Sequence, residues 1–257
     1  MNKLRIGICG WGNVATGLFK TLQSNAAEIK KRSNLEIEII VIGARRDNPK
    51  CDPGNVTIER DIFKVIDHDI DVVVELIGGV DVARDLILKA LNAKKHVVTA
   101  NKAVIFNHGN ELFSVANKNG VKLLYESSVC AGTPIIKLLN QELAASKISK
   151  ISGMLNGTSN FILSNMEEGM EFEPTLKLAQ EKGYAEPDPS FDIEGTDAAH
   201  KIGILSSLAF GSSLPPKDFY IEGINGIHKD EINNKGIEKV AKEYEVIVNF
   251  IQSDLKW

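Results

Sequence analysis

The chain has 257 residues, enough for two modest domains that each bury a hydrophobic core. Hydrophobic residues make up 43% of it and charged residues 25%, a balance that excludes a disordered chain and a fibrous repeat. The formal net charge of −4 lacks the basic excess needed to bind a nucleic-acid backbone, so we expect no nucleic-acid partner.

The cysteines and the apolar runs favour a cytoplasmic protein. Cys9, Cys51 and Cys130 are odd in number, widely spaced and without a C-x-x-C pair, a usage that predicts neither disulfides nor zinc. The N-terminus enters an apolar run without a signal-peptide core, and no apolar run approaches the ~20 residues that span a bilayer. We therefore expect no membrane partner.

Residues 4–125 alternate between strand and helix patterns. Nearly continuous apolar runs, typical of strands buried in a parallel sheet, occur at Leu4–Cys9, Ile37–Ile42 and Val72–Ile77. The first run is followed by apolar residues at helical spacing: Val14, Leu18 and Leu22. The later elements expected are a helix over Val82–Ala93, a strand over His96–Thr99, a helix over Leu112–Asn119 and a strand over Val121–Tyr125. This alternation predicts a Rossmann-type parallel sheet.

The rhythm of the sequence changes after Cys130. The patterns then predict a helix over Ile135–Ala145, a half-buried strand over Ile148–Leu155, a helix from Glu173 that ends before Gly183, and a helix over Thr196–Phe210. We therefore expect an α/β chain with a Rossmann-type domain over residues 1–130 and a second, α+β domain over residues 131–257.

The segment Gly10-Trp11-Gly12-Asn13-Val14-Ala15 has the G-x-G-x-x-A form of the dinucleotide fingerprint and lies between a predicted strand and a predicted helix. Glycines in this place let the backbone approach a pyrophosphate at the N-terminus of the helix. The alternative is a glycine turn needed only for tight packing. We expect cofactor contacts from Gly10, Trp11, Gly12, Asn13 and Val14.

The second predicted strand ends in Gly43-Ala44-Arg45-Arg46, at the place where an acidic residue would hold the ribose diol of NAD. A guanidinium group, with Arg45 the first candidate, suits the 2′-phosphate of NADP instead. Asp47 follows at once and could still reach a diol, and the arginines could be no more than a solvated loop. The sequence thus mildly favours NADP over NAD.

Five carboxylates precede a single lysine between Gly183 and Lys201. Asp197 and Lys201 are four residues apart on a predicted helix and therefore share a face, while Glu186 and Asp192 lie on the loop before it. A surface ion pair behind an acidic loop is the alternative, and composition does not decide between the two.

The spacing of residues in this stretch closely resembles the signature of the homoserine dehydrogenase family: Ala179, Gly183, Pro189, Asp192, Gly195, Asp197 and Lys201. Other segments agree with the family in order, and together they cover most of residues 4–225: Glu75-Leu76-Ile77-Gly78-Gly79, Thr99-Ala100-Asn101-Lys102, Glu126 to Pro134 and Asn156-Gly157-Thr158-Ser159-Asn160.

The resemblance implies reversible oxidation of L-homoserine to L-aspartate 4-semialdehyde with NAD(P), a step toward threonine and methionine. Lys201 matches the acid/base lysine of the family, and Asp197 would orient it. Because a free lysine is protonated at neutral pH, it acts as a base only where burial or a second cation favours its neutral form. Lys102, beside the nicotinamide in the family, could be that cation.

The resemblance also assigns binding residues. Glu186 matches a substrate-binding glutamate and could receive the substrate ammonium together with Asp192. Thr158 is assigned to the substrate, and Ile77, Gly78 and Gly157 to the cofactor. The alternative for the Asn-Gly-Thr segment is a strand-to-helix turn with a threonine cap.

The segment from Glu126 to Thr133 resembles the monovalent-cation site of the family, in which backbone oxygens of Glu126, Val129, Ala131 and Thr133 would ligate sodium. Family members usually have glycine where this chain has Cys130. A small buried apolar residue is the alternative role for that cysteine.

Members of the family continue past the point where this sequence ends, so we expect residues 131–257 to be an incomplete substrate-binding and dimerisation domain. A last helix is predicted over Ile237–Ile251, and the family implies a homodimer. Two other functions stay open: a non-catalytic nucleotide-binding module, and an aldehyde dehydrogenase that uses Cys130 as nucleophile.

Overall fold

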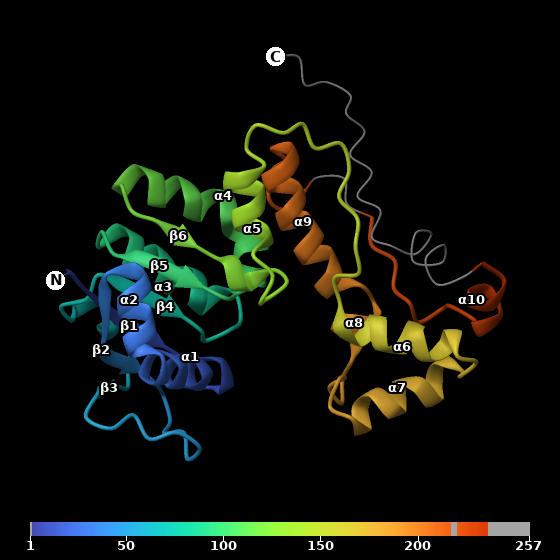
Figure 1. The fold of residues 1–257 in the computed structure, drawn as a ribbon, viewed down its shortest axis with the longest axis horizontal. Helices are drawn as coiled ribbons and strands as arrows, with labels where there is room; N and C mark the ends of the chain where they lie inside the picture. Colours follow the sequence, from blue (N-terminus) through green and yellow to red (C-terminus); the bar gives the residue numbers. More distant parts are fainter. Residues whose placement is uncertain (1, 217–219, 236–257) are drawn as a thin grey trace. The chain divides into compact units, whose positions relative to one another are not determined.

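A computed structural model describes residues 2–216 and 220–235 of the chain. It divides the chain into two compact units between Lys137 and Leu138, rather than after residue 130 (Figure 1). None of the helices among the described residues is long and apolar enough to cross a membrane.

Unit 1 is built on a six-stranded parallel sheet with the strand order β3-β2-β1-β4-β5-β6 (Figure 1). The strands are β1 (Asn2–Cys9), β2 (Leu35–Gly43), β3 (Thr57–Glu59), β4 (Val72–Glu75), β5 (His96–Thr99) and β6 (Leu123–Leu124). From β1 the chain adds β2 and then β3 on one side. It then adds β4, β5 and β6 on the other side of β1. The expected Rossmann-type sheet is therefore present, and its strand order reverses between β1 and β4.

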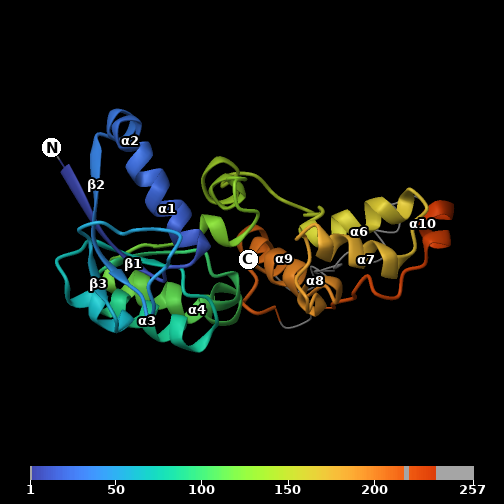
Figure 2. The same cartoon turned by 90° about the horizontal axis from the view of Figure 1, so that it is seen from below.

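Helices cover both faces of this sheet (Figure 2). One face carries α1 (Asn13–Ser24) and α2 (Ala26–Ser33), and the other carries α3 (Asp81–Asn92) and α4 (Lys102–Asn119). Short helical turns complete the unit: η1 (Ile62–Asp67), η2 (Glu126–Ser128) and α5 (Ile135–Lys137). With both faces covered, the central strands bury side chains on each side, which explains their continuous apolar runs.

The apolar face of α1 differs from the predicted stripe. Ala15 and Phe19 are buried against β1 and β2, and the Phe19 ring meets Trp11 edge-on at 5.2 Å. Val14 is 62% exposed, so its place in the predicted stripe was wrong. Leu18 and Leu22 of that stripe do pack against the core, so the buried face of α1 is centred on Ala15 and Phe19.

The remaining differences in unit 1 are in short or weakly patterned elements. The helix expected over Leu112–Asn119 begins ten residues earlier, at Lys102, where the Asn101 side chain caps it by accepting from the Val104 amide. The sequence did not predict α2, which buries none of its residues, or β3, which is only three residues long. Neither element carries enough apolar periodicity to be recognised.

The regular elements in the described part of unit 2 are all helices or helical turns, joined by loops (Figure 1). Its elements are η3 (Leu138–Glu142), α6 (Gly157–Glu167), α7 (Phe172–Glu181), α8 (Ser190–Ile193), α9 (Thr196–Phe210) and α10 (Lys229–Lys235). The core of the unit forms between α6, α7 and the chain around residues 224–232, with Ile162, Met166 and Ala179 almost fully buried. The expected helix after Glu173 and the expected helix over Thr196–Phe210 are both present.

One element predicted for this part of the chain was wrong, and another is shorter than predicted. The segment Ile148–Leu155 has no strand partner among residues 2–216 and 220–235, because a period of two marks an extended chain and does not provide a neighbour to pair with. The helix expected over Ile135–Ala145 is present only in part, because α5 continues directly into the π-helical turn η3, which ends at Glu142. The helix predicted over Ile237–Ile251 lies outside the described residues.

Candidate functional site

The turns after β1 and β4 lie together at the carboxyl ends of the strands, where the strand order reverses. Ligands of open parallel sheets bind at this kind of switch point. Gly10 has φ +105°, and a Cβ built on it would lie 2.6 Å from the carbonyl oxygen of Leu76. At Gly10 the chain's own packing therefore requires glycine.

Gly12 gives the opposite result. It caps α1 with an ordinary φ of −91°, and a Cβ built on it would have no atom within 4 Å. Packing within the chain thus does not explain this glycine, whereas close approach of a phosphate to the N-terminus of α1 does. Asn13 and the exposed Val14 form the first turn beside this open space, but the Trp11 side chain is buried and only its backbone faces the turn.

The turn after β4 presents the two predicted cofactor residues Ile77 and Gly78. Gly78 and Gly79 both have φ near +70° and open space at their Cβ positions. The buried carboxylate of Glu75 accepts hydrogen bonds from the backbone amides of Ile77 at 2.9 Å and Gly78 at 3.4 Å. The sequence motif contains Glu75 but does not indicate a role for it.

Arginines gather at the carboxyl ends of β2 and β3. Arg45 and Arg46 are exposed in the loop after β2. Arg60 follows β3 and donates to the Asp47 carboxylate at 2.7 Å and to the Ala44 carbonyl at 3.3 Å. Sequence reasoning missed Arg60 because only the pairing of β2 with the unpredicted β3 brings it beside Arg45.

In unit 2, Asp197 and Lys201 are in direct contact on α9. The Lys201 ammonium donates to the Asp197 carboxylate and to the Leu155 carbonyl, each at 2.6 Å, and its side chain is only 18% exposed. Asp197 is buried in the first turn of α9, where the helix dipole also favours a carboxylate. This pair differs from a surface ion pair because water reaches neither group freely.

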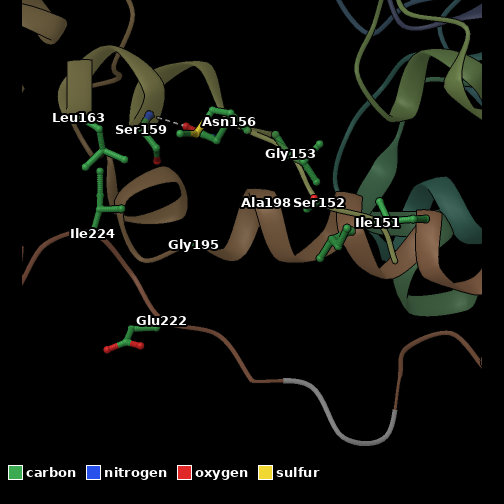
Figure 3. Close-up of a pocket in the computed structure, with 13 residues that line it drawn as sticks. Ile151, Ser152, Gly153, Asn156, Ser159, Leu163, Gly195, Ala198, Glu222 and Ile224 are labelled. Carbon is green, nitrogen blue, oxygen red and sulfur yellow. Dashed lines mark hydrogen bonds between the residues drawn. The ribbon is translucent and has the colours of Figure 1, made fainter. Parts of the chain in front are cut away.

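Asn156 connects this ion pair to Asp192. Its side-chain amide donates to Asp192 at 2.7 Å and to Asp197 at 2.8 Å. Its oxygen accepts from the Ser159 amide, which caps α6 (Figure 3). The alternative of a threonine cap was wrong, because asparagine at this position reaches the backbone amide and leaves the Thr158 hydroxyl free for other contacts.

The Thr158 hydroxyl lies 2.7 Å from the Tyr184 carbonyl and 3.1 Å from the Asp192 carboxylate. Thr158, Asp192, Asp197 and Lys201 line one open cleft of about 570 Å³, together with Gly157, Tyr184 and other residues of α6. That volume is within the usual range for a small-molecule site. Two carboxylates and one ammonium give the cluster a formal charge of −1, which favours a cationic group on a ligand.

The second cavity in unit 2 is smaller, about 80 Å³, and lies between the extended segment Ile151–Leu155 and α9 (Figure 3). Its lining is mainly apolar, and Asn156 contributes to both cavities. This apolar lining offers few polar groups for chemistry, so the open cleft is the better candidate for a reactive site.

Glu186, the remaining predicted substrate residue, is exposed and does not line the cleft. Lys102 is the first residue of α4 in unit 1, at the positive end of the helix dipole, where helix stability alone would favour an acidic residue. In the loop expected to bind sodium, the Thr133 carbonyl accepts from the Ile135 amide.

The same loop contains Cys130 at φ +50°, a left-handed conformation in which glycine is less strained. The Glu126 carboxylate accepts from the amides of Ile136 and Lys137 and so caps α5. Over the described ranges 2–216 and 220–235, no three His, Cys, Asp or Glu side chains are grouped to hold a metal ion. A cation in this loop would depend on backbone oxygens.

A doubly wound sheet with an open glycine turn at its switch point, followed by a unit with a partly buried lysine–carboxylate cleft, is the arrangement expected of a dinucleotide-binding protein of the dehydrogenase type. A family model described as homoserine dehydrogenase, NAD binding domain, matches residues 10–126, and one described as homoserine dehydrogenase matches residues 134–252. The chain belongs to the homoserine dehydrogenase family.

Individual relatives agree with this assignment. Homoserine dehydrogenase of Pseudomonas aeruginosa is 50% identical over 235 residues, which are 91% of this chain and 54% of the relative. The crystal structure of a homoserine dehydrogenase from Thiobacillus denitrificans is 43% identical with a TM-score of 0.87 and covers 91% of this chain and 55% of that one. The chain spans about half the length of the curated relatives it matches.

Two archaeal structures are shorter than those relatives. A protein from Archaeoglobus fulgidus assigned to the family is 32% identical with a TM-score of 0.80, over 91% of this chain and 77% of that one. A hyperthermophilic archaeal homoserine dehydrogenase in complex with NADPH is 28% identical with a TM-score of 0.77, over 88% and 75%. The second of these two structures thus contains a nicotinamide cofactor.

Proposed function

We propose that the chain catalyses the reversible, NAD(P)-dependent oxidation of L-homoserine to L-aspartate 4-semialdehyde. The observation that supports it most is the contact of Lys201 with Asp197 in a cleft that Asp192 and Thr158 also line. A hydroxyl group that loses a hydride must also lose a proton, and the cleft offers one partly buried amine for that transfer.

Four residues of the cleft have roles in this proposal: Thr158, Asp192, Asp197 and Lys201. Asp192, with the net negative charge of the cluster, receives the substrate ammonium, and Thr158 and the exposed Glu186 contribute to substrate binding. Lys201 uses two of its three N–H donors on Asp197 and Leu155. The third is directed to the substrate oxygen, to which Lys201 gives a proton in the reducing direction and from which it takes one in the oxidising direction.

The nicotinamide ring, when bound, supplies the acceptor or donor of the hydride. We propose that the turns at Gly10–Val14 and Ile77–Gly79 hold the dinucleotide on unit 1. Gly157 is assigned to the cofactor by the resemblance to the family alone. Lys102, at the carboxyl end of β5, is assigned to the same cofactor.

NADP is the preferred cofactor in this proposal. Arg45, Arg46 and Arg60 supply three guanidinium groups beside the expected position of the adenosine ribose, and Arg60 neutralises the Asp47 carboxylate that could otherwise hold a diol. Arg60→Ala is expected to lower kcat/KM for NADP⁺ while leaving that for NAD⁺ unchanged or raised. An equal loss with both cofactors would contradict the preference.

Three further proposals follow from family membership. Sodium binds the backbone oxygens of Glu126, Val129, Ala131 and Thr133, the chain pairs with a second copy, and the protein acts in the cytoplasm. A higher melting temperature in sodium chloride than in choline chloride tests the first proposal. Light scattering after gel filtration tests the second, and cell fractionation the third.

The experiment that tests the main proposal is absorbance at 340 nm during incubation with L-homoserine and NADP⁺ or NAD⁺. Lys201→Ala is expected to lower turnover at least ~100-fold, since positioned acid–base groups contribute rates of this order. Lys177→Ala, which removes an exposed lysine from α7, is the matched control and should retain turnover. Binding of NADPH by the wild-type chain without any turnover would instead favour a non-catalytic nucleotide-binding module.

A further inference from the structure

Glu75 is a fully buried carboxylate that none of the roles above uses. It ends β4, and its side chain has 0% exposure. Within residues 2–216 and 220–235, no lysine, arginine or histidine forms an ion pair with it, so the cost of burying it is offset by hydrogen bonds alone. A fully buried carboxyl group without a cationic partner is unusual enough to require a reason.

The hydrogen bonds of Glu75 connect two turns of the sheet. One carboxylate oxygen accepts from the amides of Ile77 and Gly78, and the other accepts from the Thr99 hydroxyl. Thr99 belongs to the neighbouring strand β5, where it is paired with Glu75 of β4. The turn after β4 is therefore tied to the end of β5 through one side chain.

The connection continues to the start of α4. The Thr99 oxygen accepts from the Asn101 amide at 2.9 Å, and the Asn101 side chain donates to the Gly79 carbonyl at 2.7 Å. The same side chain caps α4, whose first residue is Lys102. Glu75, Thr99 and Asn101, which we term the β4–β5 clamp, thus form a closed circuit around the glycine turn.

We propose that Glu75 is a positioning residue that acts through the β4–β5 clamp to preset the Ile77–Gly79 turn and the start of α4 for the nicotinamide half of the dinucleotide. This inference rests on the proposed function, since it assumes that unit 1 binds a nicotinamide dinucleotide. Gly78 and Gly79 have positive φ and open surroundings, so this turn is flexible by composition. Because an ordered turn binds its ligand at a lower entropic cost, the hydrogen bonds of the clamp favour binding by holding the turn in one conformation.

The two halves of the sheet make the proposal specific. In a doubly wound sheet a dinucleotide lies across the switch point, with its adenosine half over the β1–β2 side. The clamp belongs entirely to the β4–β5 side. Loss of the clamp should therefore weaken a complete dinucleotide and spare a ligand that fills only the adenosine half.

The test compares Glu75→Gln and Thr99→Val with the wild-type chain. Glu75→Gln keeps the volume and replaces one acceptor by a donor, and Thr99→Val removes the hydroxyl. Thr99→Ser restores the hydroxyl and is the conservative rescue. Asp71→Asn, on the residue that precedes β4 at its opposite end, and Thr175→Val, on a buried hydroxyl of α7, are matched controls.

Dissociation constants are measured by fluorescence titration with NADPH and NADH, and with adenosine 2′,5′-bisphosphate as the adenosine probe. Glu75→Gln and Thr99→Val should weaken dinucleotide binding about tenfold, the equivalent of about 1.4 kcal/mol. Thr99→Ser and both controls should stay within about twofold of the wild type, as should adenosine 2′,5′-bisphosphate with every variant. Melting temperatures confirm folding, and Thr99→Val carries the test if Glu75→Gln does not fold.

The possible failures are distinguishable. An equal loss for the dinucleotides and the adenosine probe would mean that Glu75 only stabilises the sheet, and unchanged dinucleotide binding would mean that the clamp has no role; either result overturns the inference. Absence of binding by the wild-type chain would instead overturn the proposed function, and the inference with it.

Discussion

Replacing Asn156 by aspartate would keep the oxygen that caps α6 and remove the amide that donates hydrogen bonds to Asp192 and Asp197. The oxygen that accepts from the Ser159 amide remains, but the amide that donates to Asp192 and Asp197 becomes a third acceptor. Two hydrogen bonds at 2.7 and 2.8 Å are thereby replaced by contacts between carboxylate oxygens. Asn156→Asp therefore isolates the electrostatic role of this residue from its role as a cap.

Hydrogen bonds to charged groups contribute about 1.5–3 kcal/mol each, so losing two of them should lower the free energy of unfolding of unit 2 by about 3 kcal/mol or more at pH 7. Proton uptake by the crowded carboxyls limits this loss, because like charges raise the pKa of the introduced group above its unfolded value. The variant's deficit should then be small below about pH 4 and grow as the pH rises through the raised pKa.

Hydrogen–deuterium exchange read peptide by peptide is the suitable assay, because the two units need not unfold together. Peptides from α6 and α9 should lose protection at pH 7 and regain part of it on acidification, while peptides from unit 1 should not change. Asn101→Asp is the matched control, since Asn101 also caps a helix but donates to the backbone carbonyl of Gly79. Equal effects of the two substitutions, or a deficit in α6 that does not vary with pH, would refute the electrostatic account.

Three further predictions concern unit 1. Gly10→Ala should destabilise the fold by about 1–2 kcal/mol or more in thermal melts, because the added methyl would meet the Leu76 carbonyl in a left-handed conformation. Gly12→Ala should change stability by less than about 1 kcal/mol and yet weaken NADPH binding; unchanged NADPH binding would show that the open glycine does not face a phosphate. Burial, and secondarily the charge of Glu75, raises the pKa of the Cys9 thiol to about 12. Iodoacetamide at pH 8 should therefore modify the partly exposed Cys130 well before Cys9, and comparable rates by mass spectrometry would contradict the buried environment.

The sequence predicted those parts of the molecule whose signals are local. The turn from Gly10 to Val14 follows a strand and opens a helix, and Asp197 and Lys201 are one helical turn apart, so both patterns could be recognised without knowing the rest of the fold.

Other features depend on contacts between distant parts of the chain. Asn156 meets partners 36 and 41 residues away, and Arg60 reaches the Ala44 carbonyl after β2 only through the pairing of a three-residue strand. The alternation in Ile148–Leu155 predicted a strand that is absent among the described residues, since a ladder requires a partner. Glu75 could not be distinguished from any other carboxylate next to a turn, because its burial follows from the sheet as a whole.

The most direct test of the central claim is to follow the hydride itself. The chain is incubated with L-homoserine in which both hydrogens of the alcohol carbon are replaced by deuterium and with NADP⁺ or NAD⁺, and the reduced cofactor is analysed by mass spectrometry. One deuterium is expected in each reduced nicotinamide formed by the wild-type chain and by Lys177→Ala. Lys201→Ala is expected to form almost no product. Reduced cofactor without deuterium, or undiminished transfer in Lys201→Ala, would contradict the central claim.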